Sequence, residues 1–198
     1  MKVIYGTTNK NKIAEMQSYF KDYDMELISL KDIGFDDDII EDGDTFLENS
    51  LIKAKAIKDF CNKNNITYPI LTDDAGLCVK ALDNRPGVYT ARYAGDHAPQ
   101  IDNINKMLFE LKDKSDRSAT FYCALTFVYN DDFIQVEGFK KGHIANTPGT
   151  LGGFTFGPLF IPEGHDKPYN DLVDFETHRH NAIYRLIDVL KEKEIINK

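Results

Sequence analysis

The sequence predicts an α/β protein built on a mixed sheet, and three observations lead to that class. Short apolar strand patterns alternate with helical patterns in the first half of the chain. Two longer strand patterns then follow one another, separated only by turn-forming residues. A helical pattern closes the chain. Alternating strands and helices followed by a strand pair indicate a sheet with both parallel and antiparallel neighbours.

Two strand patterns and two helix patterns come first in the chain. Lys2–Tyr5 and Glu26–Ser29 are short apolar runs typical of strands, and Asn11–Phe20 carries its apolar residues at helical spacing. A second helix is expected to begin at Thr45, because Thr45 and Glu48 have the spacing of a capping box. Its apolar residues Leu47, Leu51, Ala54, Ile57 and Cys61 are expected on one face.

The second half of the chain contains a helix, a hairpin and a closing helix. Asp102–Leu111 has a helical pattern. Thr120–Tyr129 and Phe133–Ile144 are predicted to form a hairpin, because the three residues between them are an asparagine and two aspartates. The glycine-rich segment Pro148–Pro162 follows, and Thr177–Glu194 is the predicted last helix.

The composition narrows the possible functions. The 198 residues predict a single domain over 1–198, with the hydrophobic (42%) and charged (28%) content of a globular protein. The net charge of −8 argues against a nucleic-acid surface, while a small phosphorylated ligand remains open. The three cysteines form no C-x-x-C pair, which argues against a structural zinc site or a disulfide framework. The absence of a membrane-length apolar stretch and of a signal-peptide pattern predicts a cytoplasmic protein with no membrane partner.

The first chemical motif, Thr7 to Lys12, lies between the first strand and the first helix. Hydroxyl, amide and ammonium groups at a helix start are suited to phosphate binding, and Thr7, Asn9 and Lys12 supply them. The pattern is not a Walker A loop. Considered alone, the motif is more simply a helix cap with a solvated lysine.

The second motif begins in an acidic loop and continues into the second helix. Glu41 and Gly43 end the loop, and Lys53 follows on the helix. A run of carboxylates is usually a solvated loop, and helix lysines are usually solvated as well. A functional role for Glu41 and Lys53 therefore depends on the other motifs.

The third motif is an Asp73-Asp74 pair, which the local sequence places at the end of a strand in a tight turn at Ala75-Gly76. Carboxylates in this arrangement can hold a divalent cation or activate a water molecule. Asp and Gly are also frequent in turns for purely conformational reasons, so the motif alone is weak.

Two further motifs lie in the last third of the chain. Phe154 and Phe156 flank a small residue in the glycine-rich segment, where an aromatic ring can stack on a flat base. The alternative is that both rings belong to the core. His178 and Arg179 open the last helix and could read the carbonyl edges of a base, although such a pair is more often an exposed helix start.

Taken together, these segments resemble the inosine triphosphate pyrophosphatase family, which acts on non-standard purine nucleoside triphosphates. The matching patterns extend from Thr7 to Arg179 in the order found in that family. They are T-x-N-x-x-K, E-x-G-x-x-F-x-E-N-x-x-x-K, D-D-[SA]-G-L, P-G-x-x-[ST]-A-R-[YF]-[AS]-G, G-G-F and [ST]-H-R.

The resemblance implies a fold, an activity and an assembly. The expected fold is two-lobed α/β, with an elongated mixed sheet flanked by helices and a central cleft. The expected reaction is Mg²⁺-dependent cleavage of the α–β phosphoanhydride of ITP, dITP or XTP, which releases the monophosphate and pyrophosphate. The expected assembly is a homodimer.

The resemblance also implies a role for each motif residue. Those expected to hold the triphosphate are Thr7, Asn9, Lys12 and Lys53. Those expected to hold Mg²⁺ are Glu41, Asp74 and, in support, Asp73, with Asp74 also activating the water. Those expected around the base are Phe154, Phe156, His178 and Arg179. Lys167 and Ala75 are further candidates without an assigned role.

The chain departs from the family pattern in the region expected to surround the base. The family commonly has G-G-F-G-[YW]-D-P, whereas Gly157 replaces the aspartate here. The segment before His178 is shorter than usual and lacks a lysine, for which Lys167 could compensate. Loss of a carboxylate partner can change base discrimination by about 1–3 kcal/mol.

Three functional hypotheses follow. The first is the family reaction on ITP, dITP and XTP. The second is the same chemistry on another nucleotide, modified or standard, because the base pocket differs. The third, of a different class, is a nucleotide-binding or sensing module with weak turnover. Retention of the four charged phosphate and metal residues argues against the third hypothesis; these residues are Lys12, Glu41, Lys53 and Asp74.

Overall fold

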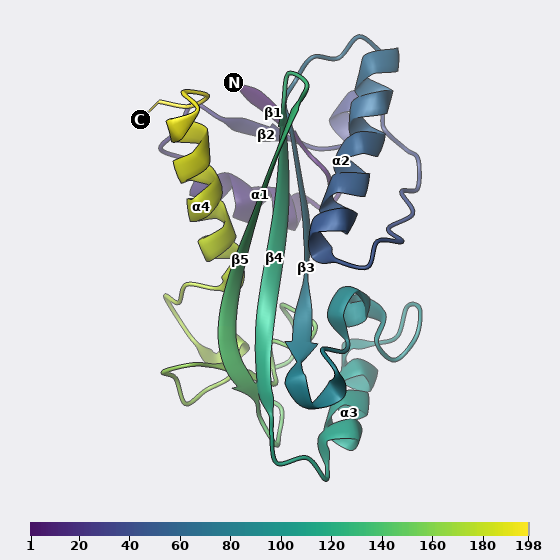
Figure 1. The fold of residues 1–198 in the computed structure, drawn as a ribbon, viewed down its shortest axis with the longest axis vertical. Helices are drawn as coiled ribbons and strands as arrows, with labels where there is room; N and C mark the ends of the chain where they lie inside the picture. Colours follow the sequence, from purple (N-terminus) through teal and green to yellow (C-terminus); the bar gives the residue numbers. More distant parts are fainter. Residues whose placement is uncertain (198) are drawn as a thin grey trace. The chain divides into compact units, whose positions relative to one another are not determined.

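The computed structural model describes residues 1–197 apart from the side chain of residue 11. Six strands form one sheet in the order β2-β1-β3-β4-β5-β6 (Figure 1). The strands are β1 (Lys2–Tyr5), β2 (Glu26–Ile28), β3 (Ile70–Val79), β4 (Ser118–Tyr129), β5 (Asp132–Ile144) and β6 (Phe160–Pro162). The α-helices are α1 (Lys10–Tyr19), α2 (Phe46–Lys63), α3 (Gln100–Leu111) and α4 (His178–Glu192). The 3₁₀ helices are η1 (Lys31–Ile33), η2 (Lys80–Leu82), η3 (Gly87–Arg92) and η4 (Tyr169–Asp171).

The sheet contains both parallel and antiparallel pairs. β1 pairs in parallel with β2 and β3, so that Ile4 lies opposite Ile28 on one side and Ile70 on the other. β5 pairs antiparallel with β6, with Gly142 opposite Pro162. The two-residue turn between β4 and β5 forms the predicted hairpin, since so short a connection joins antiparallel strands. The predicted α/β class with a mixed sheet flanked by helices is therefore confirmed.

The chain divides into two compact units, to which β3, β4 and β5 each contribute. The first unit contains residues 1–74, 124–137 and 182–198. The second unit contains residues 75–123 and 138–181. The prediction of a single domain over 1–198 is not tested by this division and stays a prediction.

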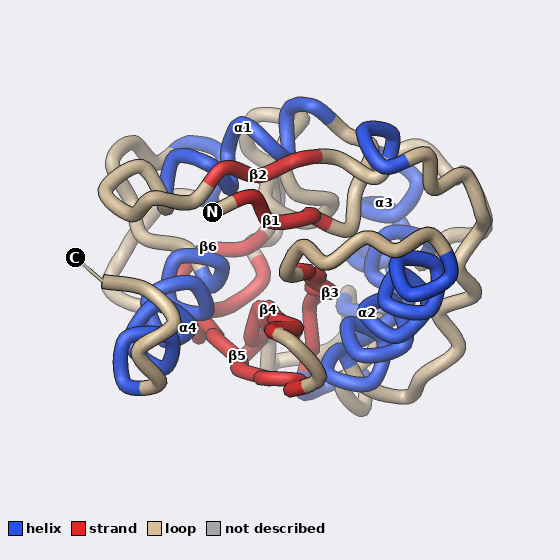
Figure 2. The backbone as a smooth tube through the Cα atoms, turned by 90° about the horizontal axis from the view of Figure 1, so that it is seen from above, coloured by secondary structure: helices blue, strands red, loops and turns tan. Residues whose placement is uncertain are grey.

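The first unit is organised around α2. Ala54, Ile57 and Cys61 of this helix pack with Ile4 of β1 and Ile70 of β3. Burial of a helical stripe against strands is what an amphipathic helix requires. Figure 2 shows α2 and α4 on opposite sides of the strands β3 to β5.

The start of α2 has the predicted cap. Thr45 is the N-cap, its hydroxyl accepts the Glu48 N–H at 3.1 Å, and the Glu48 carboxylate accepts the Thr45 N–H at 3.1 Å. The predicted capping box is therefore present. Along the predicted apolar face, Ala54, Ile57 and Cys61 are buried, and Leu47 and Leu51 are partly buried. Asn49 and Ser50 are also buried, and both make hydrogen bonds.

The second unit has its own apolar core. Ile104, Met107 and Leu111 form the buried stripe of α3 and pack with Leu77 of β3 and Phe121 of β4. The segment that follows β3 in the chain supports that strand. The hydroxyl of Thr90 in η3 accepts the Leu77 N–H at 2.8 Å and donates to the Gly87 carbonyl at 2.6 Å.

The path of β3 contradicts the predicted tight turn at Ala75-Gly76. The strand continues from Ile70 to Val79, so Asp73 and Asp74 lie in the middle of a strand. The Asp-Asp-x-Gly pattern suggested a turn because those residues favour turns locally. Here the two aspartates are held in a strand by partners far away in the sequence, as described below.

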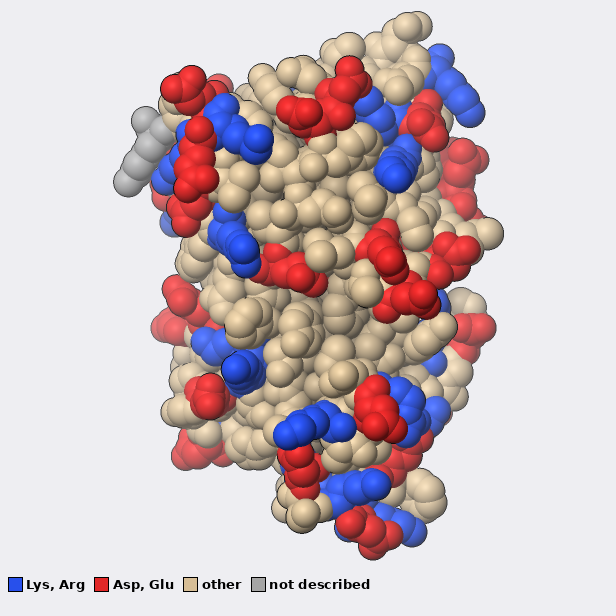
Figure 3. All heavy atoms as spheres, in the orientation of Figure 1, with Lys and Arg blue, Asp and Glu red and all other residues tan. Residues whose placement is uncertain are grey.

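The remaining features of the fold are the surface charges, the cysteines and the lengths of the helices. On the face drawn in Figure 3, acidic and basic side chains are interspersed. Among the described residues, no disulfide joins Cys61, Cys78 or Cys123. Within residues 1–197, no helix combines the length and the apolar character that crossing a membrane requires.

Candidate active site

Lys53 joins the second and third sequence motifs in the first unit. This lysine lies on α2, and its ammonium is 3.1 Å from the Glu41 carboxylate in the preceding loop. The same ammonium donates to the backbone carbonyl of Asp73 on β3 at 2.8 Å. Because Lys53 is partly buried, these contacts fix the acidic loop against the strand rather than leaving both solvated. The prediction that solvated charges alone explain this motif does not hold.

Asn49 links the start of α2 to Asp74. Its amide nitrogen donates to the Asp74 carboxylate at 3.1 Å, and its amide oxygen accepts the Gly43 N–H at 2.8 Å. Gly43 has to be small here, because a Cβ would lie 2.8 Å from both the Asn49 amide oxygen and the Glu48 Cβ. The carboxylate of Asp74 is thereby oriented by the buried Asn49 side chain, whose amide oxygen is fixed in turn by the Gly43 N–H.

Asp73 has a different environment from its neighbour. The Tyr5 hydroxyl of β1 donates to the Asp73 carboxylate at 2.8 Å, and Asp73 is 7% exposed. A buried carboxylate needs such a partner, because an unpaired buried charge is costly. Adjacent residues of a strand point to opposite faces. The Asp73 carboxylate is thus paired with β1, whereas that of Asp74 is directed toward Asn49.

The charge balance of this cluster makes Asp74 a weaker acid than usual. Burial raises the pKa of the Asp74 carboxyl to about 6, and the charges of Glu41 and Asp73 act in the same direction. The hydrogen bond from Asn49 and the charge of Lys53 oppose the rise. A carboxyl with a pKa near neutrality can accept a proton at physiological pH, as a general base must.

The cluster has the donor chemistry of a Mg²⁺ site without being a closed cage. Within residues 1–197, no three His, Cys, Asp or Glu side chains are grouped closely enough to hold a metal by themselves. Mg²⁺ prefers hard oxygen ligands, and it usually binds through one or two carboxylates plus substrate phosphates and waters. Glu41 and Asp74 supply such carboxylates, and the charge of Glu41 is near enough to raise the pKa of Asp74.

The N-terminal motif adopts local turns at the start of α1. The Thr7 hydroxyl accepts the Asn9 N–H at 3.2 Å, and the Asn9 amide oxygen accepts the Lys12 N–H at 3.3 Å. These bonds are the capping contacts that the sequence predicted as the simpler alternative. Lys12 is exposed. Phosphate binding by Thr7, Asn9 and Lys12 remains a prediction.

An aromatic cluster in the second unit surrounds His178. The imidazole is stacked on Phe121, with ring centroids 4.7 Å apart, and lies parallel to Tyr169 at 5.9 Å. His178 is 0% exposed, and neither ring nitrogen has a hydrogen-bond partner among the described residues. Burial, with the nearby charges of Arg179 and His180, lowers the pKa of His178 to about 3. The ring is therefore neutral at pH 7 and carries one donor and one acceptor.

Phe154 and Arg179 lie beside this imidazole. The Phe154 ring is 5.0 Å from that of His178, and the Arg179 guanidinium lies over the Phe154 ring at 5.1 Å. The structure therefore brings together three of the four predicted base-site residues. Phe156 is not among them. It is fully buried against Tyr93, 6.1 Å between centroids, and belongs to the core, which was the alternative prediction.

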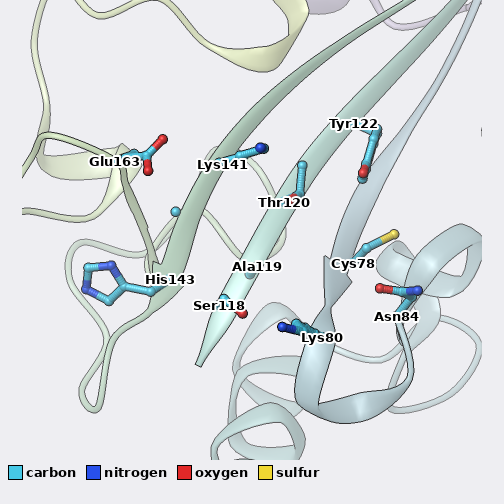
Figure 4. Close-up of a pocket in the computed structure, with 11 residues that line it drawn as sticks. Cys78, Lys80, Asn84, Ser118, Ala119, Thr120, Tyr122, Lys141, His143 and Glu163 are labelled. Carbon is cyan, nitrogen blue, oxygen red and sulfur yellow. The ribbon is translucent and has the colours of Figure 1, made fainter. Parts of the chain in front are cut away.

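The remaining candidates and a surface hollow lie elsewhere in the second unit. Lys167 is exposed in the loop before η4, and Ala75 is partly buried within β3. A hollow of about 400 Å³ is lined from β3, β4 and β5 and includes Cys78, Tyr122 and His143 (Figure 4). None of the predicted site residues lines this hollow.

Several important residues had no distinct signal in the sequence. Asn49 lies within a motif but carries no separate signal for a site, and Tyr5 falls in an ordinary strand pattern. Phe121 and Tyr169, which flank His178, have no motif around them in the sequence. Contacts such as Tyr5 with Asp73, 68 residues apart, depend on strand pairing and not on local pattern.

The fold and the carboxylate–lysine cluster define a class, namely mixed α/β proteins with an acidic site suited to a cation and a phosphorylated ligand. The chain belongs to the Ham1 family, whose model matches residues 3–191. The family resemblance inferred from the motifs is thereby confirmed.

Relatives and solved structures agree with this assignment. The dITP/XTP pyrophosphatase of Flavobacterium johnsoniae is 37% identical, with 96% of this chain and 98% of the relative covered. The dITP/XTP pyrophosphatase of Bacillus subtilis is also 37% identical, with coverages of 95% and 96%. The structure of the Staphylococcus aureus Ham1 protein matches with a TM-score of 0.85 and 30% identity, covering 98% of this chain and 100% of the other.

Proposed function

We propose that the protein hydrolyses non-standard purine nucleoside triphosphates, namely ITP, dITP and XTP, to the monophosphate and pyrophosphate. One observation carries the proposal. Lys53 and Asn49 of a single helix connect Glu41 of the second motif with Asp73 and Asp74 of the third. Two relatives that are named dITP/XTP pyrophosphatases support the choice of substrate.

In this proposal the first unit binds the triphosphate. Lys53 and Lys12 supply positive charge, and Thr7 and Asn9 supply short polar groups at the start of α1. Positive groups and helix N-termini stabilise phosphates through charge and directed N–H groups. The lysines would neutralise charge on the departing pyrophosphate, which is the main electrostatic demand of phosphoryl transfer.

Glu41 and Asp74 would hold Mg²⁺, with Asp73 in support. When bound, the ion neutralises phosphate charge and makes a water molecule more acidic. The water oxygen attacks the α-phosphorus, its proton passes to the Asp74 carboxylate, and the bond to the bridging oxygen breaks. Asn49 keeps Asp74 oriented for that transfer. One water is consumed, and one monophosphate and one pyrophosphate are formed.

The second unit is proposed to bind the base. Phe154 would stack on the purine, and His178 and Arg179 would hydrogen-bond to its edge. The two buried ring nitrogens of His178 have no hydrogen-bond partner among the described residues. Buried polar atoms normally have one, so a bound base is a reasonable partner for them. A neutral imidazole offers one donor and one acceptor, which suits a carbonyl beside an N–H.

The finer properties of the assembly belong to the same proposal. The family resemblance supports a homodimer, and the sequence composition supports a cytoplasmic location with no nucleic-acid or membrane partner. Light scattering tests the dimer directly, because the expected mass is twice the 22.6 kDa of one chain.

The role of Asp74 is tested with Asp74→Asn. The substitution keeps the size of the side chain but removes the proton acceptor. We expect kcat with ITP and Mg²⁺ to fall by about 10²–10⁴-fold, the usual range for a general base. Calorimetric titration with ITP should still detect binding.

Asp59→Asn is the matched control, because Asp59 is an exposed aspartate of α2. Its kcat should equal that of the wild type. Equal turnover by the wild type and Asp74→Asn would show that another group activates the water. If neither the wild type nor Asp74→Asn turned ITP over but both bound it, the hypothesis of a nucleotide-binding module would be favoured instead.

A further inference from the structure

Gly157 stands where the family pattern has an aspartate, and the structure explains why a side chain is absent. Gly157 does not have a positive φ, so its backbone could accommodate any residue. A Cβ at this position would nevertheless lie 2.2 Å from the amide oxygen of Asn170 and 3.1 Å from its Cγ. The space that a residue-157 side chain would use is therefore filled by the carboxamide of Asn170.

The carboxamide of Asn170 is held in one orientation. Its nitrogen donates to the Thr150 carbonyl at 2.8 Å and to the Gly152 carbonyl at 2.7 Å. Since both acceptors are backbone oxygens, the nitrogen must face them and the oxygen must face the other way. The oxygen lies toward Gly157 and also toward Gly153, where a Cβ would be 3.1 Å from it. No donor to this oxygen exists among the described residues.

Asn170 is also linked to the residues proposed to bind the base. Gly153 precedes Phe154, and the Gly157 N–H donates to the Phe154 carbonyl at 2.9 Å. The neighbour of Asn170 in η4 is Tyr169, whose ring lies parallel to the imidazole of His178. All of these residues belong to the second unit.

We propose that Asn170 determines base specificity by replacing the missing aspartate. Its amide oxygen would accept a hydrogen bond from a base N–H, such as the N1–H of a 6-oxopurine. This inference rests on the proposed function, because it concerns the same base site. A neutral acceptor forms a weaker hydrogen bond than a carboxylate. The protein should therefore prefer 6-oxopurines to adenine, but by a smaller factor than with a carboxylate at this place.

A double-mutant cycle tests this exchange. The quantity measured is the ratio of kcat/KM for ITP to kcat/KM for ATP, because adenine has no N1–H. We expect Asn170→Ala to lower this ratio about tenfold, the loss of one hydrogen bond of typical strength. Gly157→Asp alone should lose activity on both nucleotides and lower Tm, because the new side chain collides with Asn170. The double variant Gly157→Asp/Asn170→Ala should regain activity, with a ratio above that of the wild type.

Two controls separate geometry from charge. Gly157→Ala should also lower Tm, and Gly157→Ala/Asn170→Ala should recover Tm without raising the ratio. Asn105→Ala, an exposed asparagine of α3, should match the wild type in both quantities.

The outcomes that overturn the inference are distinct from failure of the proposed function. An unchanged ratio in Asn170→Ala, or equal losses on ITP and ATP, would reduce Asn170 to a loop-holding residue. Full activity of Gly157→Asp would show that the two side chains do not compete for space. Absence of pyrophosphate release by the wild type would contradict the proposed function. In that case the role of Asn170 is tested by binding titrations with IMP and AMP. Asn170→Ala should still reduce the ratio of the affinity for IMP to the affinity for AMP.

Discussion

At the scale of single residues, Asp73 and Asp74 are adjacent on β3, but their side chains point to opposite faces and have different partners. Asp73 accepts a hydrogen bond from a buried tyrosine of β1, and Asp74 accepts one from Asn49 of α2. The first contact fixes the strand, and the second directs a carboxylate that has a raised pKa. Asn49 is therefore expected to matter to catalysis without touching the phosphates.

Asn49→Ala tests that positioning role. Loss of the amide leaves Asp74 without its orienting donor and Gly43 without its acceptor, so kcat should fall about 10–100-fold, as for other orienting contacts. KM for ITP should change much less than kcat. Asn62→Ala, an exposed position of the same helix, should leave both unchanged. A rise in KM with unchanged kcat would instead place Asn49 in substrate binding.

His178 links protonation to folding. The unfolded imidazole binds a proton below about pH 6.5, whereas the folded one does so only near its pKa of about 3. Its contribution to stability is therefore complete above pH 6.5 and is lost as the pH falls toward 3.

The variant His178→Phe removes this titration. Between pH 7 and pH 4 the wild type should lose about 3 kcal/mol more unfolding free energy than the variant. Urea unfolding at both pH values measures the difference, and the other titrating groups are common to both proteins. Parallel pH profiles for the two proteins would show that the folded imidazole binds its proton at an ordinary pKa.

At the scale of elements, α2 organises the first unit because its start is fixed by the sequence. The capping box at Thr45 sets the helix phase, which places Asn49 and Lys53 on the side that faces β3. The prediction of this helix was accurate because capping contacts are local. The tight turn at Ala75-Gly76 was wrong because β3 is held by Tyr5 and Asn49, which are distant in the sequence.

Thr45→Ala should destabilise the protein by about 1 kcal/mol, the usual cost of losing an N-cap. For a chain of this size the expected fall in Tm is about 2–4 °C. Thermal unfolding measures the effect, and Thr45→Ser should restore most of it because serine is also a good N-cap. Equal losses for the alanine and serine variants would mean that the methyl group, and not the capping bond, is important.

At the scale of the whole molecule, the sequence predicted the class of fold and most element positions. Short strands, the hairpin and the amphipathic helices depend on local periodicity, which a single sequence contains. The division into two compact units and the contacts within each site depend on long-range pairing. The exchange between Gly157 and Asn170 is of this second kind, since the two residues are separated by a strand and a loop.

The most direct test of the central claim is product analysis with Mg²⁺ on a panel of triphosphates. The panel contains ITP, dITP, XTP, the standard nucleotides and several modified purines, and pyrophosphate is measured separately from orthophosphate. We predict equal amounts of monophosphate and pyrophosphate, formed chiefly from ITP, dITP and XTP. Pyrophosphate chiefly from another nucleotide would assign a different substrate. Orthophosphate as the first product, or no product at all, would contradict cleavage at the α–β bond.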